Sequence, residues 1–445
     1  FLKFLGFSVG TAALATSCEM PVRKAIPYLN TPPEITPGMA NYYASSFFNG
    51  HDFCPVVVKV REGRPIKLEG NKLSSVTKGG TSARVQASVL TLYDSARQQY
   101  PLKDGQKTDW ATADNEIKTK LEEIAAKEGK IVILSSTVIS PSVLQVFEEF
   151  KAQYPTTEVV YYDTISYDAM RRANAATFGK NEIPGYRFDK ADVIVGFNAD
   201  FLGSWLSPVE FSKQYAKTRE LSKDKTTMSK HYQFESYMSL TGSNADIRYA
   251  IKHSEEAVIL LNLYNEIASQ SNMPTFKVES SPIDLHHMVD ELMHHKGKSL
   301  VVSGSNDVYI QSIVNGINFL LENTGQTLQF ERTLLTKKGD DQKVDDLIGS
   351  MSRGEVGALF LYNVNPVYDY FNGAEFAKGI AQVEMSVALC EYNDETAKLA
   401  NFLCPDNHFL ESWGDAEAYT GMYTLAQPAI RKIFDTRQAP ESFLK

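Results

Sequence analysis

Short apolar segments alternate with segments of helical periodicity along the chain after residue 110. The apolar segments predict buried strands at residues 130–135, 159–163, 191–197, 299–303, 358–362 and 384–389. Apolar residues at helical spacing predict helices at residues 116–127, 142–154, 284–295 and 307–322. Strands that alternate with helices form parallel sheets covered by helices. The pattern therefore predicts an α/β fold with two doubly wound lobes, at residues 106–280 and 281–445.

The part of the chain before residue 106 has a different pattern. Residues 55–60 and 65–70 flank a turn that contains Gly63, which predicts a β-hairpin. Five prolines interrupt the preceding segment, at positions 21, 27, 32, 33 and 37, and favour an extended arm up to about residue 50. We expect residues 21–105 to form this arm and a small β-rich module.

The first 17 residues resemble the apolar region of an export signal, with one charge at Lys3 and small residues before Cys18. A segment of this length is shorter than the roughly 20 apolar residues that cross a bilayer. Phe1, Leu2 and Lys3 resemble the residues just after the paired arginines of a twin-arginine signal. We expect residues 1–20 to be a retained, membrane-touching segment, or alternatively a helix packed on a partner, with Cys18 as the candidate lipid-attachment residue.

Composition excludes several classes of protein. The chain has 445 residues and 43% hydrophobic content, enough for more than one packed core. Its net charge of −9 argues against a nucleic-acid partner, because phosphate backbones are bound by clustered Lys and Arg. The four cysteines, at positions 18, 54, 390 and 404, form no Cys-x-x-Cys pair, which excludes the usual local zinc or iron–sulfur motifs.

Two passages of the N-terminal module resemble the molybdopterin oxidoreductase superfamily. Residues 47–70 resemble the segment in which active relatives carry Cys-x-x-Cys-x-x-x-Cys before a hairpin, and those positions hold Phe47, Gly50 and Cys54. Residues 79–94 resemble the segment that supplies the fourth thiolate, where this chain has Ser82. Because such clusters are normally held by four thiolates, the resemblance implies a vestigial cluster site.

A third passage, residues 387–427, resembles the late signature of the same superfamily, with Glu-Thr-Ala at 395–397 and Glu-Ser-Trp-Gly-Asp at 411–415. Together with residues 198–208 and 365–368, it resembles the molybdopterin-oxidoreductase-like part of the B subunit of bacterial alternative complex III. The resemblance implies a molybdopterin-oxidoreductase-like fold on the periplasmic side of the inner membrane.

That family assembles into a quinol-oxidising respiratory complex. The resemblance implies three kinds of partner: an iron–sulfur ferredoxin-like domain or chain, a multihaem cytochrome c subunit and integral membrane quinol-oxidising subunits. A terminal oxidase is a further expected partner. On this resemblance, we expect the ferredoxin-like half of that subunit and the C-terminal cap of active relatives to lie outside these 445 residues. We therefore expect iron–sulfur clusters and c-type haems in other parts of the complex, and no cofactor in this chain.

Two local patterns suggest ligand sites. His287, Glu291 and His295 share one face of the predicted helix 284–295 at a spacing that suits a metal, although a solvated helix face explains them better. Residues 303–307 follow a strand and precede a helix, as phosphate-binding turns do, but a single glycine is weak support.

The C-terminal region offers two further candidates. His408, Glu411, Ser412 and Asp415 are too close in the chain for a hydrolase triad, so we interpret them as structural, with Trp413 as a packing anchor. Cys390 and Cys404 fall on neighbouring predicted strands and are expected to form a disulfide or to remain buried free thiols.

The leading hypothesis is a non-catalytic, cofactor-free scaffold subunit of a respiratory complex. One alternative is an active molybdopterin-dependent oxidoreductase, which the fold favours and the missing thiolates oppose. The other is an exported small-molecule or nucleotide-binding protein that uses the two lobes alone.

Overall fold

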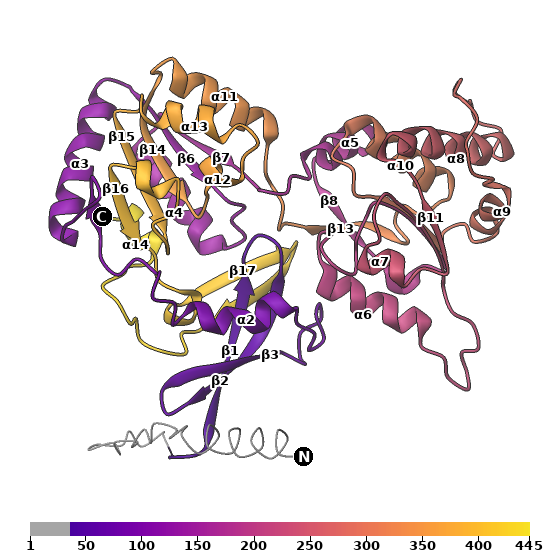
Figure 1. Cartoon of the computed structure of the whole chain (residues 1–445), viewed down its shortest axis with the longest axis horizontal. Helices are drawn as coiled ribbons and strands as arrows, with labels where there is room; N and C mark the ends of the chain where they lie inside the picture. The colour runs from indigo at the N-terminus through magenta and orange to yellow at the C-terminus, as the bar shows by residue number, and fades with distance from the viewer. Residues whose placement is uncertain (1–35) are drawn as a thin grey trace, which may run out of the picture.

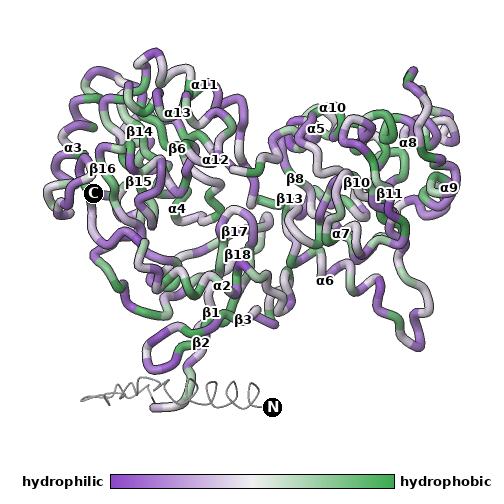
Figure 2. Tube along the Cα trace, in the orientation of Figure 1, coloured by the Kyte–Doolittle hydropathy of each residue, from purple (hydrophilic) through white to green (hydrophobic). Residues whose placement is uncertain are grey.

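The computed structural model describes residues 36–445 of the chain; the export-like segment and Cys18 lie outside the described residues. Two α/β lobes stand side by side, and the N-terminal module lies beneath the first of them (Figure 1). Hydrophobic positions concentrate on the strands inside the lobes, and hydrophilic positions lie on the outer loops (Figure 2). In this part of the chain, no helix is both long and apolar enough to span a bilayer.

The first lobe contains a seven-stranded sheet of order β5-β4-β16-β15-β14-β6-β7, in which the five strands from β16 to β7 are parallel. Its strands are β4 (Leu102–Lys103), β5 (Gln106–Lys107), β6 (Lys130–Ser135), β7 (Thr157–Tyr161), β14 (Val356–Tyr362), β15 (Met385–Cys390) and β16 (Phe402–Pro405). Helices cover both faces, as predicted for a doubly wound lobe. One face carries α3 (Trp110–Ala126), α4 (Pro141–Gln153) and α14 (Ala439–Phe443). The other carries α11 (Asp341–Ser352) and α13 (Gly373–Ile380), and α12 (Pro366–Asp369) follows β14.

The second lobe contains a four-stranded parallel sheet of order β11-β10-β9-β12. Its strands are β9 (Val193–Phe197), β10 (Lys230–Glu235), β11 (Ile247–Ala250) and β12 (Ser299–Ser303). One face packs on α8 (Glu256–Gln270), α9 (His286–His294) and α10 (Val308–Leu320). The opposite face packs on α6 (Pro208–Arg219), while α5 (Asp168–Phe178) lies against α10 and α7 (Leu240–Ser243) follows β10.

The N-terminal module is an antiparallel sheet of β1 (Ala40–Phe48), β2 (Phe53–Arg61) and β3 (Arg64–Gly70), packed on α2 (Ala83–Thr91). The predicted hairpin is confirmed: β2 and β3 join through Glu62 and Gly63, both at positive φ, which matches the twist of a two-residue hairpin turn. The expected arm up to residue 50 is wrong after residue 39, because β1 pairs with β2 along its whole length.

Four strands from distant parts of the chain form a fourth sheet, of order β18-β17-β13-β8, that connects the lobes (Figure 1). It contains β8 (Ile183–Tyr186), β13 (Leu328–Leu334), β17 (Gly414–Tyr419) and β18 (Met422–Ala426). The sequence pattern gave no indication of this sheet, because β13 pairs with strands more than 80 positions away in the chain.

The lobes do not follow the expected division at residue 280. Strands β6 and β7 pair with β14 to β16, and β12 pairs with β9, so each predicted half of the chain contributes strands to both sheets. The chain crosses from the first lobe to the second after β7 and returns after β13. Hydrophobic periodicity identifies strands but not their partners, and this explains the difference.

Local sequence accounts for where many helices begin. Asp109, Ser140, Asp307 and Asp340 precede α3, α4, α10 and α11, and each side chain accepts a hydrogen bond from a backbone N–H of the first turn. These caps satisfy donors that the helix itself leaves unpaired.

Candidate functional site

The four positions that resemble cluster ligands come together in the N-terminal module. Phe47 on β1 lies directly opposite Cys54 on β2, Gly50 lies in the turn between them, and Ser82 caps α2. The Phe47 ring packs edge-to-face on Phe409, with ring centroids 5.2 Å apart. The Cys54 thiol is fully buried, and its burial raises the pKa to about 12. This geometry presents one protonated thiol and an aromatic ring where a cluster would need thiolates.

A buried carboxylate sits among these positions. The Asp52 side chain has no exposed surface and accepts hydrogen bonds from Ser82 Oγ at 2.7 Å and from Arg84 Nε and Nη2 at 2.7 and 3.1 Å. The Ser82 hydroxyl also accepts a hydrogen bond from the backbone N–H of Val85. Ser82 therefore connects the carboxylate to the start of α2, and charge-assisted hydrogen bonds from Arg84 hold the same carboxylate.

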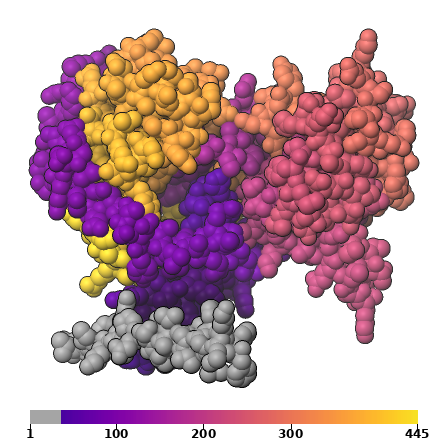
Figure 3. Space-filling model, in the orientation of Figure 1, coloured from indigo at the N-terminus to yellow at the C-terminus, as the bar shows by residue number. Residues whose placement is uncertain are grey.

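A cleft with a volume of about 580 Å³ opens at the carboxyl edge of the first lobe's parallel sheet. The chain proceeds outward from β6 to β7 on one side and from β14 to β16 on the other, so the sheet reverses order between β6 and β14. The loops at 136–140 and 363–365 that follow these two strands line the cleft, together with Ser46 and residues 48–51 of the N-terminal module. Open α/β sheets bind ligands at such a switch point. Figure 3 shows the surface hollowed where the first lobe meets the N-terminal module.

The lining of this cleft is acidic. It contains six carboxylates against one lysine, Lys337, and one histidine, His51. The six are Asp163, Asp369, Glu391, Asp394, Asp406 and Asp415. Several follow strands directly, since Asp406 comes after β16 and Glu391 after β15.

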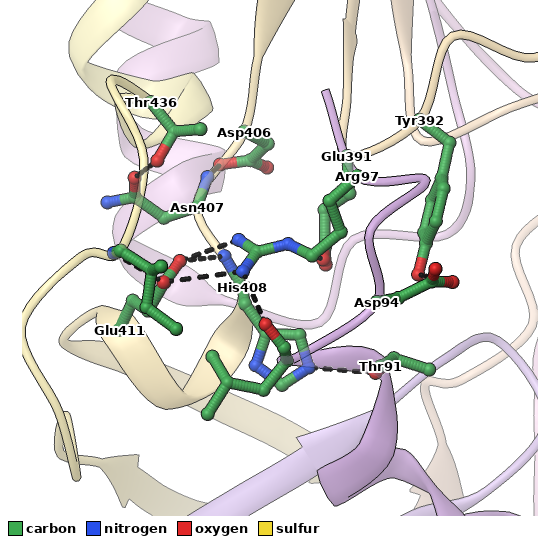
Figure 4. A network of polar contacts seen from close by, with 12 residues as sticks. Thr91, Asp94, Arg97, Glu391, Tyr392, Asp406, Asn407, His408, Glu411 and Thr436 are labelled. Carbon is green, nitrogen blue, oxygen red and sulfur yellow. Dashed lines mark hydrogen bonds and ion pairs between the residues drawn. The ribbon is translucent and has the colours of Figure 1, made fainter. Parts of the chain in front are cut away.

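Behind the cleft, Arg97 forms the centre of a buried polar network (Figure 4). Its side chain is 1% exposed and binds Glu411, which is 0% exposed, through Nη1 at 3.3 Å and Nη2 at 2.7 Å. Nη1 also donates to the Leu92 carbonyl, and Nε lies 3.5 Å from Glu391 Oε2. The carboxylate of Glu411 also accepts from the backbone N–H groups of His408 and Ile433. The network joins the end of α2 to the segment after β16.

Burial shapes the protonation of this region. It raises the pKa of Glu391 to about 8, with a further increase from Asp406, and it raises the pKa of Asp406 to about 7. Burial also lowers the pKa of His408 to about 4, with Arg97 adding to the effect. In contrast, the pKa of Glu411 is lowered, because hydrogen bonds from Arg97 and backbone N–H groups outweigh its burial. The Arg97–Glu411 pair therefore lies beside two carboxyl groups whose pKa values are raised by burial.

The metal site suggested by His287, Glu291 and His295 is not formed in the structure. In the described residues, no group of three or more His, Cys, Asp or Glu side chains could hold a metal. On α9, Glu291 accepts from Lys230 Nζ and the Tyr232 hydroxyl, both at 2.6 Å, which agrees with a polar helix face rather than a metal site.

The turn after β12 is occupied by its own hydrogen bonds. The Asp307 carboxylate accepts from the N–H groups of Tyr309 and Ile310 at the start of α10, and Asn306 binds Ala169 N and Asp341. Because the Asp307 carboxylate already accepts hydrogen bonds from the N-terminal N–H groups of α10, these groups are not free to bind an external anion.

The two C-terminal cysteines are free and buried. Cys404 pairs in register with Leu389, one residue before Cys390, so the two side chains point to opposite faces of the sheet. This geometry selects the free-thiol alternative over the disulfide. Burial raises the pKa of Cys404 to about 12 and the pKa of Cys390 as well.

The structural interpretation of residues 408–415 is supported in part. His408 and Glu411 are buried, and Glu411 pairs with Arg97 as described. The expected role of Trp413 as a packing anchor is wrong, because its side chain is 66% exposed at the cleft.

The sequence interpretation missed Asp52, Arg97, Glu391 and Asp406. A usable signal was present for the last two, since an acidic residue follows each of two adjacent strands near the end of the chain. Asp52 and Arg97 have no comparable signal, because their partners are contributed by distant segments.

Comparison with known proteins identifies a relative in sequence and a neighbour in structure. No family model matches the chain. The "Menaquinone reductase, molybdopterin-binding-like subunit" of Nitratidesulfovibrio vulgaris (strain Hildenborough) is 24% identical to it over 443 residues, covering 88% of this chain and 63% of that protein. The chain thus spans less than two thirds of that relative. The structure of "Acetylene Hydratase from Pelobacter acetylenicus" superimposes with a TM-score of 0.70 at 13% identity, over 90% of this chain and 68% of the other.

These comparisons confirm the predicted molybdopterin-oxidoreductase-like fold. They also confirm the resemblance to a molybdopterin-oxidoreductase-like subunit that the three sequence passages indicated.

Proposed function

We propose that this chain is a non-catalytic subunit of a membrane-bound, quinol-oxidising electron-transfer complex of the alternative complex III type, on the periplasmic side of a bacterial inner membrane. In this role it holds no redox cofactor and positions iron–sulfur and haem subunits. The observation that carries the proposal is the N-terminal module, where Phe47, Gly50, Cys54 and Ser82 supply one thiol of the four thiolates that a cluster needs.

The cleft of the first lobe supports the absence of a pterin cofactor. A pterin nucleotide carries phosphates, and the lining offers six carboxylates but only Lys337 and His51 as candidate cations. Lys337 is itself 5% exposed, and burial lowers its pKa. Like charges at short range repel, and anionic ligands are usually bound by Arg, Lys or helix N-termini. The residues present therefore do not fit a polyanionic cofactor.

The similarity to a menaquinone reductase subunit supports the respiratory assignment. A subunit that retains a fold but not its ligands acts through its surfaces. Its contribution to electron transfer is then geometric, because it fixes the distances between cofactors of other chains.

The first test is metal analysis of the complex purified from detergent-solubilised membranes. We expect no molybdenum or tungsten in stoichiometric amount with this chain, and one such atom per chain would refute a cofactor-free role. Co-purification of haem and integral membrane proteins is the second expected result. A tagged chain that purifies as a soluble monomer would instead favour an exported small-molecule-binding protein.

A single substitution sharpens the test for iron. Cys54→Ser changes one atom at the remaining thiol. If Cys54 binds no cluster, the variant complex keeps its iron content and its rate of quinol oxidation. Loss of about four iron atoms per complex would show that the module ligates a tetranuclear cluster after all.

A further inference from the structure

The N-terminal sheet presents a basic face on the side away from α2. Alternate residues of β2, at positions 56, 58 and 60, are buried against α2, so Lys59 and Arg61 point to the opposite side. In the strand register, Lys59 lies between Tyr42 on β1 and Lys67 on β3, and Arg61 lies opposite Arg64. Residues opposite one another in an antiparallel sheet share a face. Tyr42, Lys59, Arg61, Arg64 and Lys67 therefore form one surface, which we call the outer face.

The positive charge of the outer face is only partly compensated. Lys67 Nζ lies 3.2 Å from Glu69 Oε1, in a pair whose two side chains are about half exposed. Arg61 donates to the carbonyl of Gly38, an uncharged acceptor. Within residues 36–445, neither Lys59 nor Arg64 forms an ion pair. The outer face therefore keeps an excess of positive charge.

The rest of the module has the same sign, although the net charge of the whole chain is −9. Residues 36–80 contain six Lys and Arg side chains but only three Asp and Glu side chains. One of the three, Asp52, is buried and already bound to Arg84. The module therefore attracts anionic surfaces that the chain as a whole would repel.

Large apolar side chains are exposed beside these charges. Tyr42 on the outer face is 58% exposed, and Leu73 in the turn after β3 is 93% exposed. Met39 just before β1 and Ile66 on β3 are exposed as well. This mixture is typical of surfaces that lie on a bilayer, because apolar side chains enter the interface while the long stems of Lys and Arg keep their charges among the headgroups.

The sign of the charge separates this surface from a second exposed apolar surface. On β18, the side chains of Tyr423 and Leu425 are also exposed. They lie opposite Glu417 and Asp415 on β17, however, and those carboxylates repel anionic headgroups. Only the N-terminal module thus combines exposed apolar side chains with an excess of cations among these two surfaces.

From these observations we propose that the outer face lies on a bilayer and binds anionic lipid headgroups through its four cations, with Tyr42 at the interface. The proposal deepens the proposed function, on whose membrane location it rests, by naming the surface of this chain that meets the lipid. Tyrosine is enriched at membrane interfaces, and each basic side chain near an anionic surface adds to the attraction. The module also follows the export-like residues 1–17 in the chain, whose expected membrane contact would bring this end of the molecule to the bilayer.

The first test measures how the full chain partitions onto phosphatidylcholine vesicles with or without phosphatidylglycerol. Lys59→Gln with Lys67→Gln removes two cations from the outer face. Lys252→Gln with Lys378→Gln is the matched control, because it removes two exposed lysines, one from each lobe, that also pair with a glutamate.

The expected loss follows from the charge removed. Each Lys or Arg near an anionic surface strengthens binding roughly fivefold, so the outer-face variant should bind about 5- to 25-fold more weakly, the lower value applying if Glu69 already neutralises Lys67. The control should bind as the native chain does. The difference should vanish without phosphatidylglycerol and at high salt, where charges are screened. Equal binding by the two variants in the presence of phosphatidylglycerol would overturn the proposal.

A second test reports whether the outer face itself contacts lipid. Tyr42→Trp places a fluorophore on the outer face, and Tyr309→Trp places one at the exposed start of α10 as the control. In the complex reconstituted into a bilayer, we expect lipid-borne quenchers to reduce the fluorescence added by Tyr42→Trp and not that added by Tyr309→Trp. If another protein subunit covers the face, the emission added by Tyr42→Trp is blue-shifted without quenching by lipid, and the proposal is wrong.

Vesicle binding and co-purification also separate this proposal from the proposed function. A chain that neither co-purifies with haem and membrane subunits nor binds anionic vesicles refutes both. A chain that co-purifies, but whose vesicle binding is unaffected by the outer-face variant, refutes the lipid-binding face alone. Vesicle binding through the outer face without co-purification refutes the respiratory complex and supports the lipid-binding face.

Discussion

The buried ion pair between Arg97 and Glu411 allows a quantitative prediction. Glu411→Gln keeps the size of the side chain and one acceptor oxygen but removes the negative charge. Arg97, 1% exposed, then remains charged in the interior, with its nearest carboxylate at 3.5 Å on Glu391. Removing one member of a buried pair costs about 3–5 kcal/mol, because the remaining charge is left without its partner.

The expected shift in melting temperature depends on the length of the chain. Unfolding entropy is about 2.1 cal/mol/K per residue, which gives roughly 0.9 kcal/mol/K for 445 residues. A loss of about 3–5 kcal/mol then lowers the Tm by about 3–5 °C if the lobes unfold together. Differential scanning calorimetry at neutral pH measures this change.

Two comparison variants show whether the uncompensated charge is the cause. Glu355→Gln removes the same charge from an exposed pair with Arg353 and is expected to leave the Tm unchanged. Arg97→Met combined with Glu411→Leu removes both charges and should lose less stability than Glu411→Gln alone. The reasoning is refuted if the double variant is the less stable, or if Glu411→Gln shifts the Tm no more than Glu355→Gln.

Three further predictions concern protonation, thiols and packing. The pKa values of Glu391 and Asp406 are raised from 4.5 to about 8 and from 3.8 to about 7, so between these limits the folded state binds protons that the unfolded state has released, and stability should fall as pH rises from about 4.5 to about 8 and then level off. Glu391→Gln should flatten this Tm profile, and an unchanged slope contradicts the assignment. The three described cysteines should not react with a thiol reagent at about pH 8 until the chain is denatured, because all are buried and have raised pKa values. Gly196→Ala should destabilise the second lobe by about 1–3 kcal/mol, since the new Cβ would lie 2.1 Å from Gln233 Oε1; a denaturation midpoint equal to that of the native protein contradicts this packing.

Local pattern was sufficient for most elements of the fold. The apolar segments at residues 130–135 and 299–303 form β6 and β12, and the two-residue turn at Glu62 and Gly63 closes the predicted hairpin. Strand β1 was missed because the prolines before it favoured irregular chain over the whole region. The loss of cluster ligands was also readable, because it depends only on which residue types occupy four positions.

Long-range relations were decided only by the tertiary structure. The sequence determined that strands and helices alternate, since periodicity reflects which side of each element is buried. It did not determine that β6 lies beside β14, more than 200 residues later, or that Arg97 meets Glu411. Nor did composition reveal that Trp413 lies exposed at the rim of an acidic cleft. These features depend on where the chain crosses between lobes, and that choice arises from the packing of the whole molecule rather than from any local segment.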